Sequence, residues 1–203
     1  MKAIQAKASQ DFAAYTSDII SVISDLKSDV EIAIAFDVAH AAFLKAYKNH
    51  RKVLIVGNGG SAADAQHFAG ELVSRFYYDR PALAAIALTT DTSVLTAIGN
   101  DYGYEDIFAR QVQALGQTGD LLIAISTSGN SPNVLKAISQ AKNQGLTIIG
   151  LTGRGGGKMR TACDICFRVP SDSTPHIQEC HLVIEHALCA SIEQSLFGQH
   201  PPK

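Results

Sequence analysis

Residues 53–71 read VLIVGNGGSAADAQHFAGE, and the fold prediction starts from this stretch. Its first four residues, 53–56, are aliphatic without a break, which is typical of a buried strand in a parallel sheet. A glycine-rich polar turn follows at residues 57–61, and the alanine-rich residues 62–75 have high helix propensity. A strand, a tight turn and a helix start in this order expose backbone N–H groups, which favours anion binding.

The rest of the chain continues this alternation of strands and helices. Aliphatic runs bounded by turn formers predict strands at residues 83–88, 120–125, 147–151 and 165–169. Periodicity and caps predict helices at residues 93–98, 107–115, 132–145 and 175–197, with a turn-rich loop at residues 99–103. We therefore expect residues 51–203 to form an α/β core with a central five-stranded parallel sheet flanked by helices.

Residues 1–50 predict two further helices ahead of the first strand. Phe12, Ile20 and Ile23 belong to an apolar face of helical period, and Asp29 is a candidate N-cap between the two helices. The two helices could serve only to cover the sheet. Their apolar faces exceed what one side of a sheet needs, so we predict that this helical pair is used in oligomerisation.

The composition limits the classes of partner. A net charge of −2 over 203 residues gives no general electrostatic case for nucleic acid or an anionic membrane. No apolar run approaches the length of a membrane span, and the first residues lack the apolar core of a signal peptide. A hydrophobic content of 46% allows a sizeable core, and we expect one cytoplasmic domain over residues 1–203.

Two polar loops, at residues 57–61 and 126–131, each follow a predicted strand. Open parallel sheets bind ligands beyond the carboxyl ends of their strands, so these loops are the first candidates for a binding site. The second loop places hydroxyl groups before a helix that Pro132 begins, an arrangement that suits a phosphate monoester. The alternative is an ordinary serine-rich loop with one capping residue. The hydroxyl groups belong to Ser126, Thr127, Ser128 and Ser131.

The titratable candidates lie on two separate helices. His67 and Glu71 are four residues apart and share one face of the first of these, while Gln178 and His186 lie on one side of the last helix. Such nitrogen and oxygen donors suit zinc, but each residue alone is more often an ordinary packed side chain. Spacing does not show that the two helices meet. His181 is a decoy that nearly shares the face of Gln178.

The four cysteines include the pair Cys163 and Cys166 in a C-x-x-C arrangement. No second pair stands at zinc-finger spacing. We expect these two side chains to face opposite sides of a strand, and we interpret them as buried small hydrophobic residues rather than as a redox or metal site.

Four motifs together resemble the SIS (sugar isomerase) domain family, and within it the phosphoheptose isomerases. They are residues 57–61 with 64–71 (GNGGS and DAQHFAGE), residues 98–103 (IGNDYG), residues 126–131 (STSGNS), and residues 177–179 (IQE) with His186. The likeness covers nearly the whole chain. It implies an SIS-type doubly wound sandwich, a homotetramer with active sites at subunit interfaces, and one zinc ion per subunit.

The resemblance also implies roles for individual residues. Glu71 and His186 would be the catalytic proton-transfer pair. Zinc would be held by His67, Glu71, Gln178 and His186. Substrate contacts would come from Asn58, Gly59, Gly60, Ser61, Glu71, Asn100, Asp101, Ser126, Thr127, Ser128, Ser131 and Gln178.

The implied reaction is the aldose–ketose isomerisation of sedoheptulose 7-phosphate to D-glycero-D-manno-heptose 7-phosphate. It would be the first step of ADP- or GDP-heptose synthesis for lipopolysaccharide core or capsule. The alternative is a non-catalytic SIS adaptor that binds a replication initiator protein, because one such relative is similar in several segments. That relative lacks the acid matching Glu71 and the histidine matching His186, and this chain has both.

Overall fold

A computed structural model describes residues 2–198, and side chains from residue 7 onward. Met1 and residues 199–203, which belong to the expected 1–203 domain, lie outside the described part of the chain.

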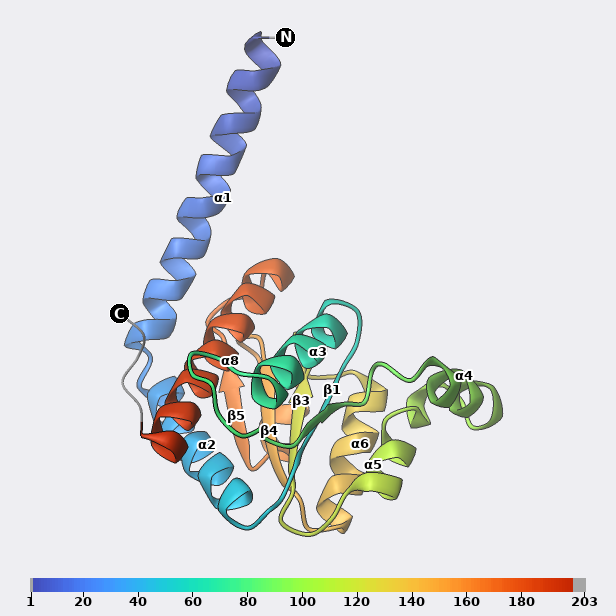
Figure 1. Ribbon diagram of the computed structural model, residues 1–203. Helices are drawn as coiled ribbons and strands as arrows, with labels where there is room; N and C mark the ends of the chain where they lie inside the picture. Colours follow the sequence, from blue (N-terminus) through green and yellow to red (C-terminus); the bar gives the residue numbers. More distant parts are fainter. Residues whose placement is uncertain (1, 199–203) are drawn as a thin grey trace.

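The centre of the molecule is a five-stranded sheet in which every pairing is parallel. The strand order is β2-β1-β3-β4-β5, which is a doubly wound order (Figure 1). This confirms the predicted α/β class. The strands are β1 (Val53–Gly57), β2 (Ala85–Ala87), β3 (Leu121–Ile125), β4 (Thr147–Thr152) and β5 (Ile165–Arg168).

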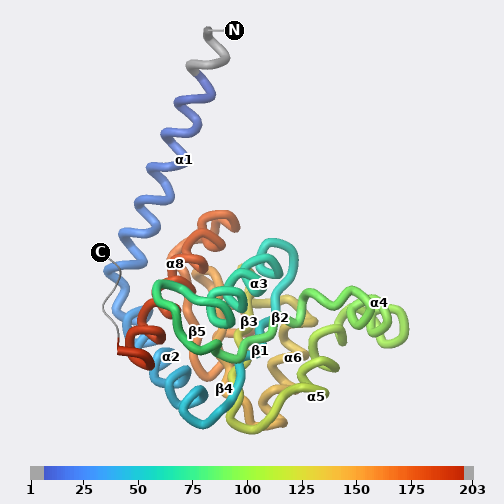
Figure 2. Tube along the Cα trace, in the orientation of Figure 1, coloured from blue at the N-terminus to red at the C-terminus, as the bar shows by residue number. Residues whose placement is uncertain are grey.

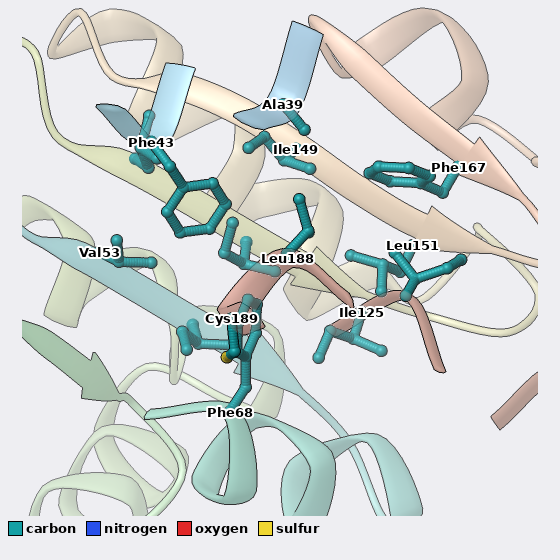
Figure 3. Packing of buried hydrophobic residues seen from close by; sticks show 14 of the residues in the cluster. Ala39, Phe43, Val53, Phe68, Ile125, Ile149, Leu151, Phe167, Leu188 and Cys189 are labelled. Carbon is teal, nitrogen blue, oxygen red and sulfur yellow. The ribbon is translucent and has the colours of Figure 1, made fainter. Parts of the chain in front are cut away.

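Helices cover both faces of the sheet. One face packs against α2 (Val30–Lys48), α3 (Gly60–Val73) and α8 (Thr174–Phe197), and the other against α5 (Ala109–Leu115), α6 (Pro132–Asn143) and α7 (Met159–Ala162). Figure 3 shows the hydrophobic core on the first of these faces. Phe43 of α2, Phe68 of α3 and Phe167 of β5 pack together there with side chains of the other strands. Aliphatic side chains on successive strand residues alternate between the two cores, which explains the unbroken apolar runs in the sequence.

The first helix, α1 (Lys2–Ser28), extends away from the body of the molecule (Figures 1 and 2). Asp29 caps α2 by accepting hydrogen bonds from the Glu31 and Ile32 N–H groups, as predicted. Of the two N-terminal helices only α2 packs on the sheet, and most of α1 is left exposed, with Phe12 at 70% and Ile20 at 63% of their full accessibility. The two predicted helices thus differ in what they contact.

Three local predictions were wrong in detail. The loop expected at residues 99–103 is partly helical, because α4 (Thr92–Asp101) continues through it and the chain turns at Gly103, which has a φ of 95°. A 3₁₀ turn, η1 (Tyr104–Asp106), then delays the start of α5. Helix α7 was not predicted, because its four residues are too few to show a period.

The sequence predicted that Cys163 and Cys166 face opposite sides of the sheet, and this prediction was wrong. The chain bends at Cys163 after α7, so this residue is not part of the regular strand. Its sulfur lies over Gly150 on β4, and Gly150 is the register partner of Cys166 on β5. Both side chains therefore lie on the face that α6 and α7 cover.

None of the helices within residues 2–198 combines the length and the hydropathy that crossing a membrane would need.

Candidate functional site

The two polar loops lie side by side at the carboxyl edge of the sheet. Gly57 at the end of β1 is the register partner of Ile125 at the end of β3, so the loops that follow them start next to each other. This is the point at which the strand order reverses, where doubly wound sheets bind ligands. The sequence predicted both loops as ligand-binding segments, and pairing of β1 with β3 places them together.

The first loop turns sharply into α3, and glycine is required for this turn. A Cβ on Gly57 would lie 2.4 Å from the Ser61 carbonyl oxygen, and Ser61 is buried in the first turn of the helix. Gly59 is the N-cap residue with a φ of 55°, a conformation that other residues rarely adopt. The exposed first N–H groups of α3 are therefore open to an anion or a polar group.

The second loop gathers hydroxyl groups at the start of α6. The Ser126 Oγ lies 2.9 Å from the Ser131 Oγ and 3.4 Å from the Ser128 Oγ. Ser131 is the N-cap residue of α6, but its side chain makes no capping bond and pairs with Ser126 instead. Pro132 has no N–H group and the Val134 N–H donates to the Asn133 side-chain oxygen at 2.9 Å, so what the loop offers to a phosphate is its hydroxyl groups and the positive end of the α6 dipole.

A third loop, at residues 153–157, supports the second. The Gly153 N–H donates to the Thr127 carbonyl oxygen at 2.9 Å, and the Lys158 N–H donates to the Asn130 side-chain oxygen at 3.0 Å. Gly129 has a φ of 64°, and a Cβ there would lie 2.1 Å from the Gly156 carbonyl oxygen. A cavity of about 290 Å³ lies between these loops and the start of α8.

Helices α3 and α8 bring the titratable side chains together. The His67 Nε2 lies 2.8 Å from the His186 Nε2, and the Glu71 Oε1 lies 3.6 Å from the same His67 nitrogen. The His67 side chain is 44% exposed and that of Glu71 26%, so a ligand can reach them. The spacing in the sequence predicted the shared face of His67 and Glu71, and the packing of the two helices adds His186.

Gln178 and His181 have different surroundings on α8. The Gln178 amide lies against Gly60, where a Cβ would approach its Nε2 to 2.4 Å, so Gln178 lies beside the first turn of α3. His181 is fully buried, and its Nε2 lies 3.2 Å from the Thr152 carbonyl oxygen. Burial lowers the pKa of His181 to about 4, so its imidazole is neutral at pH 7. His181 therefore belongs to the core, which agrees with its exclusion from the predicted zinc ligands.

Asn58 is held by residues that sequence reasoning missed. Its side-chain amide exchanges two hydrogen bonds with that of Asn133, at 2.9 and 2.8 Å, and its oxygen also accepts from the Tyr104 hydroxyl at 3.0 Å. A cavity of about 440 Å³ lies beside Asn58, Gly59 and Tyr104. Nothing in the spacing of Tyr104 or Asn133 marks these two residues, because η1 and α6 bring them to Asn58 only through packing.

Asn100 and Asp101 lie apart from the other candidates. They end α4, and the Asn100 amide donates to the Asp101 carboxylate at 2.8 Å. Both are exposed, and α4 stands at the edge of the molecule away from α8 (Figure 1). Among the residues that the structure describes, no hydrogen bond or ion pair joins either one to the His67 cluster. Within one chain the structure therefore does not unite all the predicted substrate contacts.

Two buried carboxyl groups lie close behind the cluster. Burial raises the pKa of Asp64 to about 6, although nearby His67 acts to lower it. Glu185 is fully buried, and neither of its carboxylate oxygens has a hydrogen-bond partner among the described residues. Burial, together with Asp64, raises the pKa of Glu185 well above its ordinary value. Asp64 begins the DAQHFAGE motif, but nothing in the sequence marked Glu185 or the proximity of the two carboxyl groups.

Known protein families and proteins include clear relatives of this chain. Residues 13–153 match the family model described as "SIS domain". The chain is 57% identical over 183 residues to phosphoheptose isomerase 2 of Campylobacter jejuni, covering 90% of this chain and 91% of that protein. It is 64% identical over 148 residues to the phosphoheptose isomerase of Burkholderia pseudomallei, covering 73% and 75%.

The chain belongs to the phosphoheptose isomerases of the SIS domain family. Two solved structures of this family are similar over 92% of this chain and 98% of their own. Phosphoheptose isomerase GmhA from Neisseria gonorrhoeae has a TM-score of 0.86 at 43% identity. A phosphoheptose isomerase from Francisella tularensis has a TM-score of 0.88 at 40% identity. The resemblance of the motifs is thus confirmed.

The donor atoms of the cluster formed by His67, Glu71 and His186 are of the types that bind zinc. Two imidazole nitrogens and one carboxylate oxygen converge, and these are ligands that zinc takes in proteins. Within residues 2–198 no group of three or more His, Cys, Asp or Glu side chains is already arranged as a metal site. The Gln178 amide lies at Gly60. The structure thus brings together His67, Glu71 and His186, while Gln178, the fourth predicted ligand, lies against Gly60 and makes no hydrogen bond with them among the described residues.

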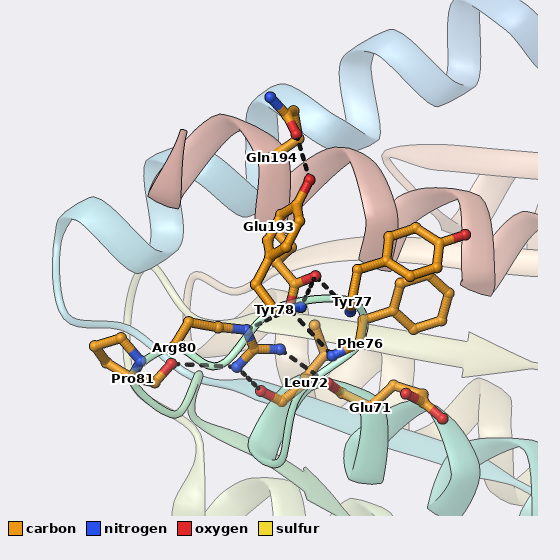
Figure 4. A network of polar contacts seen from close by, with 9 residues as sticks. All are labelled: Glu71, Leu72, Phe76, Tyr77, Tyr78, Arg80, Pro81, Glu193 and Gln194. Carbon is orange, nitrogen blue, oxygen red and sulfur yellow. Dashed lines mark hydrogen bonds and ion pairs between the residues drawn. The ribbon is translucent and has the colours of Figure 1, made fainter. Parts of the chain in front are cut away.

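An ion pair behind the cluster fixes the distance between α3 and α8 (Figure 4). The fully buried Glu193 on α8 accepts hydrogen bonds from the Arg80 Nε at 2.9 Å and from three consecutive backbone N–H groups at residues 76–78. Arg80 also donates to the carbonyl oxygens of Glu71 and Leu72 at the end of α3. This network holds the backbone of Glu71 against the helix that carries His186.

Proposed function

We propose that this chain catalyses the isomerisation of sedoheptulose 7-phosphate to D-glycero-D-manno-heptose 7-phosphate. The observation that carries the proposal is the meeting of Glu71 and His67 on α3 with His186 on α8, whose first residues also line the cavity at the hydroxyl-rich loop of residues 126–131. The relatives at 57% and 64% identity are named phosphoheptose isomerases, which supports the same reaction.

The phosphate of the substrate would bind at residues 126–131. The Ser126 hydroxyl lies 2.9 Å from that of Ser131 and 3.4 Å from that of Ser128, and the three stand before the N-terminus of α6. Hydroxyl groups and a helix N-terminus bind a phosphate without introducing a fixed positive charge, so the product can leave again. The start of α8 lines the same cavity as Thr127 and Ser128, and its Gln178 lies at Gly60.

The sugar carbons C1 and C2 would lie at the cluster of α3 and α8. Isomerisation needs a base that removes the proton beside the carbonyl group and an acid that serves the neighbouring oxygens. We assign the base to Glu71 and the acid to His186, both of which lie near the His67 Nε2. Bound zinc, held by His67, Glu71, Gln178 and His186, would polarise the carbonyl and hydroxyl oxygens and stabilise the enediolate charge. The network of Arg80 and Glu193 would keep base and acid at a constant separation.

An assay with purified full-length chain tests the function. Incubation with sedoheptulose 7-phosphate should yield the aldose product, and phosphate-free sedoheptulose should react much more slowly. Absence of the aldose under conditions that convert the substrate with the Campylobacter jejuni relative would refute the isomerase. The adaptor alternative predicts binding to a replication initiator without turnover, and no observation on the described residues favours it.

A second experiment tests the metal. Chelation should lower activity and added zinc should restore it, with only a modest shift in Tm, because the core is ample without the ion. His67→Gln should reduce the zinc content measured by elemental analysis, whereas His181→Gln should retain it. The second variant is the matched control, since His181 is buried beside Thr152 and away from the cluster. Undiminished zinc in His67→Gln would show that the ligand set is wrong.

The remaining parts of the proposal are the assembly and the cellular role. We place the active sites at the interfaces of a homotetramer, supported by the exposed apolar faces of α1 and α2 and by the position of Asn100 and Asp101 away from the cluster. A cytoplasmic location and supply of ADP- or GDP-heptose for lipopolysaccharide core or capsule rest on the family resemblance.

A further inference from the structure

Cys163 and Cys166 lie next to each other on the opposite face of the sheet from α3 and α8. The position that a Cβ on Gly150 would take is 2.6 Å from the Cys163 sulfur and 3.4 Å from its Cβ. Gly150 on β4 is the register partner of Cys166 on β5. Because neighbouring strands lie about 4.8 Å apart and register partners direct their side chains to the same face, the two thiols meet above these strands. Glycine at position 150 leaves the space that Cys163 takes.

The accessibility of this pair differs from that of the other two cysteines. Both residues of the pair are half-buried, Cys163 at the end of α7 and Cys166 on β5, the edge strand of the sheet in the described part of the chain. Cys180 and Cys189 are 0% and 2% exposed in the core between α8 and the sheet. A dissolved reagent can therefore reach the first pair and is excluded from the second.

The surroundings of the pair make Cys166 the more nucleophilic sulfur. A hydrogen bond from the Cys163 thiol lowers the pKa of Cys166 to about 7, against the effect of burial. The Thr152 hydroxyl, 3.7 Å from the Cys166 sulfur, and the positive charges of Arg168 and Arg160 act in the same direction. The same hydrogen bond and burial raise the pKa of Cys163. The thiolate form is therefore favoured at Cys166 and the thiol form at Cys163, the arrangement of a reactive dithiol.

We propose that Cys163 and Cys166 form a reversible intramolecular disulfide by exchange with a small-molecule disulfide of the glutathione type. The Cys166 thiolate attacks one sulfur of the reagent, the reagent's S–S bond breaks, and one thiolate leaves. Cys163 then gives up its proton and attacks the Cys166 sulfur, which forms the protein disulfide and expels the second thiolate. The protein loses two hydrogen atoms and the reagent is reduced to two thiols.

The bond would join the end of α7 to β5 beneath the loop at residues 153–157. Gly156 in that loop packs against the side chains of Arg160 and Arg168, and Gly153 donates to Thr127 of the hydroxyl loop. The dithiol is thus a modification site separate from the His67 cluster, on the opposite face of the sheet from α3 and α8.

The test uses the full-length chain with oxidised glutathione at neutral pH, followed by acid quenching, alkylation and peptide mass mapping. The wild type should lose alkylation at Cys163 and Cys166 together, carry no glutathione there, and regain both thiols with a reducing dithiol. Cys163→Ser should keep glutathione on Cys166, because the second attack is removed. Cys166→Ser should react at least ~10-fold more slowly at Cys163, because burial still raises the pKa of this thiol and no neighbouring thiol lowers it as Cys163 does that of Cys166.

Cys180→Ser and Cys189→Ser are matched controls and should form the same disulfide as the wild type. Alanine variants at 163 and 166, with Tm measured for each, separate a loss of reactivity from a loss of folding. The proposal is overturned if the wild type keeps four alkylatable thiols, if Cys163 or Cys166 pairs instead with Cys180, Cys189 or a second chain, or if Cys166→Ser reacts as fast as the wild type.

Discussion

Glu71 is the residue on which the proposed proton transfer depends. Glu71→Gln keeps the shape of the side chain and removes the base, so we expect turnover to fall on the order of 10²-fold or more. The Tm should stay close to that of the wild type, because the Glu71 carboxylate is part-exposed and only its backbone carbonyl bonds Arg80. Steady-state kinetics with sedoheptulose 7-phosphate measures the effect. A folded variant with a near wild-type rate would exclude Glu71 as the base.

Gly60 is the residue at which α3 and α8 approach each other near the first loop. In Gly60→Ala the new methyl group would lie 2.4 Å from the Gln178 Nε2. The amide end of Gln178 is flexible, so we expect it to be displaced while the backbone holds. Activity should fall ~10-fold or more with little change in Tm, if Gln178 contacts the substrate or the metal as proposed.

Gly70→Ala is the matched control for this substitution. It adds the same methyl group to the same helix, but no atom lies within 4 Å of the new position. Alanine in a helix interior is stabilising relative to glycine by up to about 1 kcal/mol, so Tm should stay level or rise and activity should be unchanged. Equal activity in the two variants would show that the position of Gln178 is not important.

At the scale of secondary-structure elements, Glu193 connects α8 to the segment that follows α3. Glu193→Gln leaves Arg80 buried without its counter-charge, and we expect a loss of about 3 kcal/mol or more in the free energy of unfolding. For a chain of this length that corresponds to a fall in Tm on the order of 10 °C. Glu105→Gln, in an exposed ion pair with Lys136, should change stability by less than about 1 kcal/mol.

The same carboxylate predicts how the effect depends on pH. Burial alone would raise the pKa of Glu193, but the hydrogen bonds from residues 76–78 and Arg80 outweigh it, and the pKa in the folded state is lowered. The group therefore stabilises the fold above its unfolded pKa, and this contribution is lost as pH falls through the folded pKa. The difference in Tm between wild type and Glu193→Gln should shrink in acid. A constant or growing difference would contradict the assignment of the ion pair.

At the scale of the whole molecule, α1 predicts assembly. Phe12, Ile20 and Ile23 share one face of this helix and are exposed in the single chain. Burial of such a face between chains stabilises an oligomer by roughly 25 cal/mol per Å². Light scattering should give about four times the chain mass of 21.6 kDa.

A neighbouring pair of substitutions locates the interface. Ile20→Glu places a charge on the apolar face of α1 and should shift the assembly toward smaller species with lower activity. Ser21→Glu adds the same charge on the opposite, exposed side of the same helix and should leave the mass unchanged. An active monomer at micromolar concentration would refute the proposal that the sites lie at subunit interfaces.

The sequence by itself determined the features that depend on neighbouring residues. The aliphatic runs of β1 and β3, the glycine turn into α3, the Asp29 cap and the pairing of His67 with Glu71 on one helix face follow from local period and backbone preference. The hydroxyl loop at the start of α6 was likewise predicted from its place after a strand. Family resemblance added Gln178 and His186, which spacing alone left open.

Only the tertiary structure decided which of these features meet. Pairing of β1 with β3 placed the two loops together, and packing of α3 on α8 brought His186 to His67 and Gln178 to Gly60. The reciprocal bonds of Asn133 with Asn58, the ion pair of Arg80 with Glu193 and the neighbouring thiols over Gly150 likewise required the fold. The reason is physical: contacts between residues far apart in the chain are set by strand order and helix packing, which period and propensity do not encode.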